Sequence, residues 1–497
     1  MTITHNQDSE SPFLPTPARH WIDGAWVEGG TTGESVNPAT DEVLGDFSDA
    51  DEAVVAAAIE VARERFETTS WRTDRHARAK ALWDLATAFE QNFDRLALAI
   101  TIENGKPLRE AQFEVSLCAP KLRYFAALAL TDLGTSMAGA NGDLSVTVHE
   151  AIGAAGVIVP WNSPVVLAVR SFAPALAAGC TAVIKMPAQT ALTNAVMAEV
   201  IASVTSLPPG ILNIFTESGD TGAKLLVSSP HIPVISYTGS TAVGARIASA
   251  AGVQLKRVSL ELGGKTPMIV FADANLDVVV PTLTAGVTTF AGQFCMTGSR
   301  LLVQDGVYEA VLNGMAQRLR SVKVGPAADP TSDMGPLIDR ANVERVDRVV
   351  EKAIAAGAKV IERGGAVTTG PLARGAFFRP ALLEVYDNSS AIIQEETFGP
   401  VLTIQRFSDE AQAIRLANDS EYGLAASIWT RDVDLSLRVA QAIDAGSVWI
   451  NDWAKVYDNT EEGGFKQSGL GRLNGLAALE DFQEYKHIAL KPGISGN

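Results

Sequence analysis

Short apolar runs alternate with longer amphipathic stretches through the middle of the chain. The runs predict strands, and the stretches between them, where apolar residues recur every three or four positions, predict helices. Strands separated by helices of this length are typical of a parallel sheet with crossover helices. The predicted strands span 146–150, 156–159, 181–185, 211–215 and 234–237, and the predicted helices span 165–178, 191–204 and 223–227. Ligands of such sheets bind at the carboxyl ends of the strands, where Asn162, Lys185 and Ser240 fall.

The N-terminal part is predicted to be mainly helical. After short strands at 20–27 and 33–43, helical periodicity runs through 50–66, 75–102 and 108–130. Asp49 is the expected N-cap of the first helix. No pattern in these helices indicates chemistry.

A second α/β unit is predicted to begin near Arg257. A chain of 497 residues exceeds what one hydrophobic core usually serves, so two large lobes are expected. The predicted strands of the second unit span 259–262, 268–271, 359–361, 381–385, 401–407 and 446–451, and its helices span 276–289, 307–319 and 342–356.

Composition and charge narrow the functional class. Apolar residues make up 47% of the chain, and the net charge of −17 argues against nucleic acid or an anionic membrane as a partner. The longest apolar run, 165–184, contains Arg170, Pro174 and Gly179, so it predicts a buried helix, a turn and a strand rather than a membrane span. The first seventeen residues are polar, with three prolines, and are expected to form a loose arm rather than a targeting signal. A cytoplasmic enzyme is the expectation.

The chain contains only three cysteines, and one of them, Cys295, is a candidate for chemistry. The three cysteines are Cys118, Cys180 and Cys295, and the nearest two are 62 residues apart, so neither a disulfide framework nor a metal site is predicted. Cys118 and Cys180 are expected to be small buried apolar residues. Cys295 ends the segment Ala-Gly-Gln-Phe-Cys and is the candidate nucleophile. Upstream, Glu261 stands in an apolar run that stops at two glycines, as either a hydrogen-bonded buried acid or a general base with a raised pKa.

These segments, in order along the chain, resemble the aldehyde dehydrogenase superfamily. The resemblance rests on Pro-Trp-Asn-Ser-Pro at 160–164, Leu-Glu-Leu-Gly-Gly-Lys at 260–265 and Glu-Glu-Thr-Phe-Gly-Pro at 395–400, besides the cysteine segment and motifs near both ends. It implies two Rossmann-like parallel-sheet lobes with a small β extension for oligomerisation. The implied division is a cofactor-binding domain at 1–126 and 150–256, a catalytic domain at 257–476, and oligomerisation strands at 127–149 and 477–497. A homodimer or homotetramer is implied as well.

The resemblance assigns the chemistry to three residues. Cys295, with an ordinary thiol pKa and therefore partly ionised near neutrality, is expected to attack the aldehyde. Asn162 is expected to hold the oxyanion together with the backbone N–H of Cys295; capping of the next helix is the alternative for this residue. Glu261 is expected to activate the water that cleaves the thioester, which favours hydrolysis to a carboxylic acid over transfer to coenzyme A.

The implied cofactor is NAD(P)+, with NADP tolerated or preferred. Relatives often carry an acid where Ala188 stands, and its loss leaves Lys185 unopposed beside a 2′-phosphate. A glutamate is also replaced by Ala242, and a common lysine and glutamate are replaced by Ser171 and Leu473, so their proton-relay role is expected to be absent. The implied cofactor contacts are Trp161, Lys185, Ala188, Gly239, Ser240, Gly244, Leu262, Glu396 and Phe398.

Two residues bear on the substrate. Arg170 stands where many relatives have tryptophan, and Ser163, where phenylalanine is common, is expected to widen the tunnel beside Asn162. Arg170 followed by the small Ser171, together with the glutamate replaced by Leu473, resembles benzaldehyde, salicylaldehyde and vanillin dehydrogenases. Aromatic or bulky aldehydes are therefore expected, with carboxylate-bearing semialdehydes such as succinic semialdehyde as the alternative. Thr289 argues against that alternative because semialdehyde enzymes typically have arginine there. Arg170 either contacts substrate or pairs with an acid or carbonyl at the tunnel wall. A catalytically silent binding protein on the same scaffold is the alternative of another class.

Overall fold

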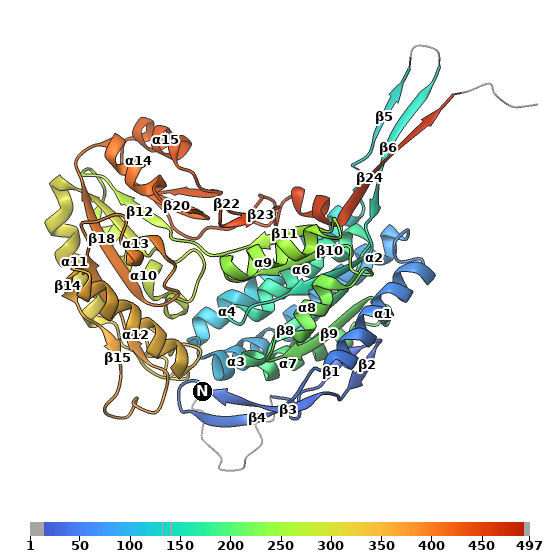
Figure 1. The fold of residues 1–497 in the computed structure, drawn as a ribbon, viewed down its shortest axis with the longest axis horizontal. Helices are drawn as coiled ribbons and strands as arrows, with labels where there is room; N and C mark the ends of the chain where they lie inside the picture. Colours follow the sequence, from blue (N-terminus) through green and yellow to red (C-terminus); the bar gives the residue numbers. More distant parts are fainter. Residues whose placement is uncertain (1–13, 132, 140–141, 492–497) are drawn as a thin grey trace, which may run out of the picture.

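Two parallel sheets, each covered by helices, organise the chain into two lobes from which a narrow β arm projects (Figure 1). The computed structural model describes residues 14–131, 133–139 and 142–491. Most of the predicted N-terminal arm and the end of the predicted tail, 492–497, lie outside the described residues. The predicted α/β class with two Rossmann-like parallel-sheet lobes is confirmed.

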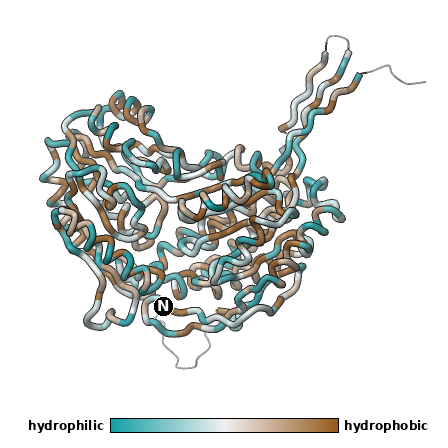
Figure 2. Tube along the Cα trace, viewed as in Figure 1, coloured by the Kyte–Doolittle hydropathy of each residue, from teal (hydrophilic) through white to brown (hydrophobic). Residues whose placement is uncertain are grey.

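The sheet of the first lobe has eight described strands, in the order β2-β1-β9-β8-β7-β10-β11-β23. Every residue of β7, β9 and β10 is buried, as expected for parallel strands with helices on both faces. Figure 2 shows hydrophobic residues concentrated along these inner strands and helices. The strands are β1 (His20–Ile22), β2 (Ala25–Val27), β7 (Ala154–Ile158), β8 (Thr181–Pro187), β9 (Leu212–Glu217), β10 (Val234–Thr238), β11 (Arg257–Glu261) and β23 (Gly469–Leu470).

Helices cover both faces of this sheet. The predicted long helical stretches are confirmed but divided, and the first N-cap was predicted wrongly. Asp51, not Asp49, accepts a hydrogen bond from the backbone of Val54, whereas Asp49 binds the N–H of Ser218. The helices are α1 (Glu52–Thr68), α2 (Arg75–Gln91), α3 (Phe93–Asn104), α4 (Leu108–Ser116), α5 (Cys118–Ala129), α6 (Pro164–Ala178), α7 (Ala191–Ala202), α8 (Thr221–Ser228) and α9 (Thr241–Gly252).

The second lobe is built on a sheet with seven described strands, in the order β14-β17-β18-β13-β12-β20-β21. Its strands are β12 (Pro267–Val270), β13 (Arg300–Gln304), β14 (Lys359–Glu362), β17 (Ala381–Glu384), β18 (Val401–Phe407), β20 (Ala425–Trp429) and β21 (Ser447–Ile450). Its helices are α10 (Leu276–Thr288), α11 (Tyr308–Ser321), α12 (Arg340–Ala355), α13 (Ala391–Gln394), α14 (Glu410–Asn418) and α15 (Val433–Ala442).

One strand lies in a different lobe from the one predicted. The sequence places the strand near Arg257 at the start of the second unit, but β11 pairs in parallel with β10 of the first sheet and antiparallel with β23. The crossing between the lobes therefore follows Glu261, in the segment 262–266, and this segment carries the two glycines of the motif. The division into domains otherwise stays a prediction.

The projecting arm is a three-stranded antiparallel sheet of β5 (Thr135–Ala138), β6 (Leu144–Ala151) and β24 (Gln483–Leu490) (Figure 1). The C-terminal strand pairs with β6 over its whole length, from Gln483 opposite Ala151 to Leu490 opposite Leu144. None of the described helices is long and apolar enough to cross a membrane. Small two-stranded sheets complete the described fold: β3 (Thr31–Asn37) with β4 (Glu42–Asp49), β15 (Gly365–Ala366) with β16 (Phe378–Arg379), and β19 (Tyr422–Gly423) with β22 (Phe465–Lys466).

Candidate active site

A strained turn at the end of α10 delivers Cys295. Phe290 and Ala291 have positive φ angles of 52° and 53°, in the left-handed region that side chains avoid. The turn is held from the first lobe, because the Glu110 carboxylate accepts the N–H of Phe290 at 3.0 Å and the Lys106 ammonium lies 3.9 Å from the centre of the Phe290 ring. Strain that persists under such outside contacts is typical of functional sites.

Two glycines allow the motifs to meet. A Cβ on Gly264 would lie 2.5 Å from the carbonyl oxygen of Cys295, and a Cβ on Gly292 would lie 2.3 Å from the carbonyl carbon of Gly399. No other residue type fits at these distances, and Gly292 also has a φ of +70°. The segments that carry Glu261, Cys295 and Glu396 are therefore packed backbone against backbone.

Glu261 ends β11 as a buried acid. The residue is 4% exposed, and its Oε1 has no hydrogen-bond partner among the residues that the structure describes. Burial raises the pKa of this carboxyl to about 8, while the nearby Arg170 cation acts to lower it. Of the two possibilities that the sequence leaves open, the structure matches an acid with a raised pKa, poised to exchange a proton near neutral pH.

The expected state of the Cys295 thiol was wrong. Although the residue is partly exposed, desolvation by the surrounding protein raises the pKa of the thiol to about 12, with Arg170 acting in the opposite direction. The thiol is therefore protonated at neutral pH in the free protein and needs a base as it attacks. Cys118 and Cys180 are fully buried, as predicted.

The amide of Asn162 points to the cysteine segment. Its Nδ2 donates to the carbonyl of Gln293 at 3.1 Å, two residues before Cys295. Helix capping, the alternative role, does not describe this residue, because Ser163 is the N-cap of α6. The N–H groups of Val165 and Val166 bind the Glu114 carboxylate instead, at 3.0 and 3.4 Å.

A cavity of about 270 Å³ gathers nine of the fourteen predicted residues. It lies between the two lobes, since its lining comes from the ends of first-sheet strands, from α12 and from the cysteine segment. The predicted residues among its lining are Trp161, Asn162, Gly239, Ser240, Glu261, Leu262, Cys295, Glu396 and Phe398.

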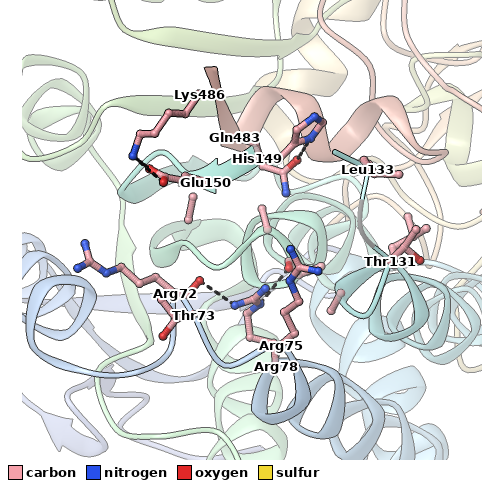
Figure 3. Close-up of a pocket in the computed structure, with 15 residues that line it drawn as sticks. Arg72, Thr73, Arg75, Arg78, Thr131, Leu133, His149, Glu150, Gln483 and Lys486 are labelled. Atoms are coloured by element: carbon pink, nitrogen blue, oxygen red, sulfur yellow. Dashed lines mark hydrogen bonds and ion pairs between the residues drawn. The ribbon is translucent and has the colours of Figure 1, made fainter. Parts of the chain in front are cut away.

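A second cavity, of about 480 Å³, lies at the base of the β arm (Figure 3). Arg75 and Arg78 of α2 face His149 and Glu150 of β6 and Lys486 of β24 across it. Within the described chain it contains none of the predicted residues, so size alone does not identify the site.

One side of the smaller cavity, where the sequence predicts cofactor contacts, combines a helix start, an acid and two rings. Ser240 is the N-cap of α9, so the positive end of that helix faces the cavity. Glu396 accepts the N–H of Gly264 at 3.1 Å, and burial raises the pKa of its carboxyl to about 7. The Phe398 ring lies edge-on to Trp161, with centroids 5.5 Å apart.

Lys185, Ala188 and Gly244 lie outside the described lining of this cavity. Gly244 has a packing role, since a Cβ there would lie 2.4 Å from Leu262. Lys185 is not unopposed, contrary to the prediction. Burial lowers the pKa of its ammonium, and the charges of Glu217, Asp49 and Asp220 act to raise it. Acids from other elements therefore face the lysine where the acid at 188 is lost.

The sequence did not predict several lining residues, among them Asn342 and Arg345 of α12. Arg345 donates to the carbonyls of Thr397 and Phe398 at 2.7 and 3.1 Å, and its Nε donates to Asn342. The pair thus fixes the segment that carries Glu396. No local signal distinguishes these residues, because their helix reads as an ordinary amphipathic one.

Arg170 and Ser163 also lie outside the cavity lining within the described residues. Arg170 donates to Glu462 at 2.9 Å, which is the wall pairing that the sequence left open. The Ser163 hydroxyl donates to the carbonyl of Asn162 at 2.8 Å and accepts from Lys106 at 2.9 Å. The structure thus gives Ser163 a polar contact behind Asn162, and its role toward substrate stays a prediction.

Comparison with known proteins supports the same chemistry. A family model described as the aldehyde dehydrogenase family matches residues 26–488. Phenylacetaldehyde dehydrogenase of Pseudomonas fluorescens is 38% identical over 99% of this chain and 100% of its own length. Aldehyde dehydrogenase 1 of Tanacetum cinerariifolium is 36% identical over 94% of both chains. A crystal structure of betaine aldehyde dehydrogenase from Staphylococcus aureus in complex with NAD+ superposes with a TM-score of 0.95 at 33% identity, covering 99% of this chain and 98% of that one.

Proposed function

The chain belongs to the aldehyde dehydrogenase family, and we propose that it oxidises an aldehyde to the carboxylic acid with NAD+ through a thiohemiacetal and a thioester on Cys295. The observation that carries this proposal is the junction of the two lobes, where Glu261, Cys295 and Asn162 line one cavity. A catalytically silent protein would have no need of a strained turn that delivers a thiol beside an acid of raised pKa.

The first half of the reaction forms the thiohemiacetal. Cys295 Sγ bonds to the carbonyl carbon while its proton passes to a base, and Glu261 is that base because its pKa near 8 allows it to accept a proton. The developing oxyanion is stabilised by the second N–H of Asn162 Nδ2, whose other N–H bonds the Gln293 carbonyl, and by the backbone N–H of Cys295. NAD+, when bound, accepts the hydride that leaves the former aldehyde carbon and so leaves a thioester.

The second half releases the acid. Glu261 first releases to solvent the proton that it took from the thiol, so that it can take a proton from water while the hydroxyl bonds to the thioester carbon. Collapse of the tetrahedral species then breaks the carbon–sulfur bond. The sulfur regains a proton, and the free carboxylic acid departs. The same oxyanion donors serve both halves, so Asn162 contributes to each.

The cavity residues fit the cofactor that this chemistry requires. The positive end of α9 at Ser240 suits a pyrophosphate. Glu396, together with the rings of Trp161 and Phe398, suits the nicotinamide ribose and ring. Lys185, outside the described lining of the cavity, is the proposed contact of the adenosine ribose. We further propose that NADP+ is accepted beside NAD+, since Ala188 adds no charge that would repel a 2′-phosphate.

The Ala188→Glu variant should favour NAD+. A carboxylate at this position repels the 2′-phosphate and attracts Lys185, so the ratio of kcat/KM for NADP+ to that for NAD+ should fall by about tenfold. Initial rates with each cofactor measure this ratio. The Ala188→Gln variant, which adds bulk without charge, is the matched control and should change the ratio little. An unchanged ratio in Ala188→Glu would remove this position from cofactor choice.

Aromatic or bulky aldehydes are the proposed substrate class. Cys295 packs on an apolar cluster with Phe294 and Trp453, and the Phe294 ring lies 5.5 Å from Phe290 and 6.0 Å from Trp453, centre to centre. The three rings lie outside the described lining of the 270 Å³ cavity, so they support a flat apolar substrate only by placing apolar surface around the nucleophile. Arg170 is engaged by Glu462, which disfavours a distal carboxylate on the substrate. One relative is a phenylacetaldehyde dehydrogenase.

Benzaldehyde should be oxidised with a kcat/KM more than about tenfold above that for succinic semialdehyde. Steady-state rates with both aldehydes and with phenylacetaldehyde, at saturating cofactor, measure the preference. A strong preference for the semialdehyde that is lost in Arg170→Leu would replace this proposal with the alternative.

The β arm is the proposed site of oligomerisation. Its strands expose Met137, Tyr485, Ile488 and Leu490, each at least 48% accessible, on a sheet whose edge strands, among the described residues, are β5 and β24. We propose a homodimer or homotetramer joined through these strands.

A further inference from the structure

A buried ion pair lies beside Glu261 and joins two distant parts of the chain. Arg170 of α6 donates from Nη1 to Glu462 Oε1 at 2.9 Å, and the two side chains are 5% and 8% exposed. From Nη2 it donates to the Thr238 hydroxyl at 3.0 Å. Thr238 stands opposite Glu261 in the pairing of β10 with β11. The guanidinium is thus tied to the strand next to Glu261.

The arginine and the glutamate each keep one unused polar atom. Arg170 Nε and Glu261 Oε1 are both buried, and neither has a hydrogen-bond partner among the described residues. Each residue is 4% exposed. The two atoms do not bond to one another, so the Arg170 cation, tied to Thr238 in the strand next to Glu261, acts on that carboxyl through its charge and not through a hydrogen bond.

Hydrogen bonds from other residues hold Glu462, the anion of the pair, in place. Asn474 Nδ2 donates to Glu462 Oε2 at 2.7 Å, and Lys121 donates to Asn474 Oδ1 at 2.5 Å and to Asp458 at 2.7 Å. The backbone of Glu462 also exchanges hydrogen bonds with Leu473, at 2.6 and 2.8 Å. Since Glu462 accepts one bond on each oxygen, Arg170 cannot turn toward a substrate without leaving a buried carboxylate unpaired.

We propose that Arg170, held by Glu462, is a positioning residue whose fixed charge favours the ionised form of Glu261, the base of thioester hydrolysis. The proposal rests on the proposed function, since it presupposes that Glu261 is the base. A fixed cation favours the charged form of a neighbouring carboxyl, whereas burial disfavours it. Arginine suits this task because it remains protonated when buried.

Three other charged residues also influence the ionisation of Glu261. They are Glu462 from the segment after β21, Arg472 after β23, and Asp481 of the turn 477–482. Glu462 acts against ionisation of Glu261 and Arg170 acts for it. Removing the Arg170 cation should therefore raise the pKa of Glu261, and removing the Glu462 anion should lower it.

The test is the pH dependence of thioester hydrolysis in Arg170→Met, Glu462→Gln and Arg170→Lys. The rate is the steady-state formation of reduced cofactor after the first turnover, at saturating benzaldehyde and NAD+. In the wild type this rate should rise with pH as Glu261 loses its proton. The midpoint should move up by about 1 pH unit or more in Arg170→Met and down in Glu462→Gln. In Arg170→Lys, which keeps a cation without the planar fork, it should lie between wild type and Arg170→Met.

If the pair of Arg170 and Glu462 were purely structural, the variants would have lower melting temperatures but unchanged midpoints of the pH dependence. That result would overturn the proposal. A tenfold rise in the KM for benzaldehyde in Arg170→Met, with an unchanged midpoint, would also overturn it, because this result would indicate that the arginine contacts the substrate. If Arg170→Met does not fold, the midpoint of Glu462→Gln tests the proposal by itself. This variant should fold because the amide oxygen of the glutamine still accepts a hydrogen bond from Arg170. A wild type that oxidises no aldehyde would overturn both proposals, whereas an active wild type with unmoved variants would overturn only this one.

Discussion

Replacing Cys295 with alanine should lower aldehyde oxidation by at least about 10⁴-fold. Without a nucleophile at this point the carbonyl carbon stays trigonal, and no hydride can leave it. Binding of NAD+ should remain nearly intact, because the groups proposed to hold the cofactor come from other segments. Reduced cofactor followed by absorbance measures the first effect, and quenching of tryptophan fluorescence by NAD+ measures the second.

Cys180→Ala is the matched control, since it removes a fully buried thiol that the active-site cavity does not contain. Its turnover should equal that of the wild type. Oxidation that persists in Cys295→Ala and fails in Cys180→Ala would mean that the wrong thiol has been assigned.

Glu261→Gln should separate the two halves of the reaction. Thioester hydrolysis should slow by about 10²–10⁴-fold because an amide cannot accept a proton from water. The first turnover should still produce up to one equivalent of reduced cofactor per site, more slowly than in the wild type, since solvent must take the thiol proton. Stopped-flow absorbance resolves the burst from the steady state.

A Glu261→Gln variant with full steady-state activity would remove this residue from hydrolysis. Loss of the burst together with the steady state would instead limit its role to the first step. The wild-type hydrolysis rate should also fall as the pH drops below about 8, since protonation of this carboxyl removes the base.

The fold followed from the pattern of apolar residues because parallel strands buried on both faces give uninterrupted apolar runs. The strand predicted at 401–407 coincides with β18. The strand near Arg257 was assigned to the wrong lobe because its own residues do not specify which sheet it joins. The N-cap was misplaced by two residues because Asp49 and Asp51 are both plausible caps, and only the contact of Asp49 with Ser218 decides between them.

The chemical residues were recognisable in the sequence because each lies in a short motif, but their supports were not. Glu462 lies 292 residues from Arg170, and Glu110 lies 180 residues from Phe290, so no local pattern joins these pairs. The same holds for the pKa of Cys295, which depends on burial by segments from both lobes. Ser171 and Leu473 were recognised in the sequence as departures from the family. The buried pair of Arg170, which precedes Ser171, and Glu462, which forms a β-bridge with Leu473, became visible only in the structure.

The covalent intermediate gives the most direct test of the central claim. The Glu261→Gln variant, mixed with benzaldehyde and NAD+ and quenched in acid after the burst, should gain the mass of one benzoyl group, and digestion should place that group on the peptide that contains Cys295. Formation of reduced cofactor without this adduct, or an adduct on another residue, would contradict the account.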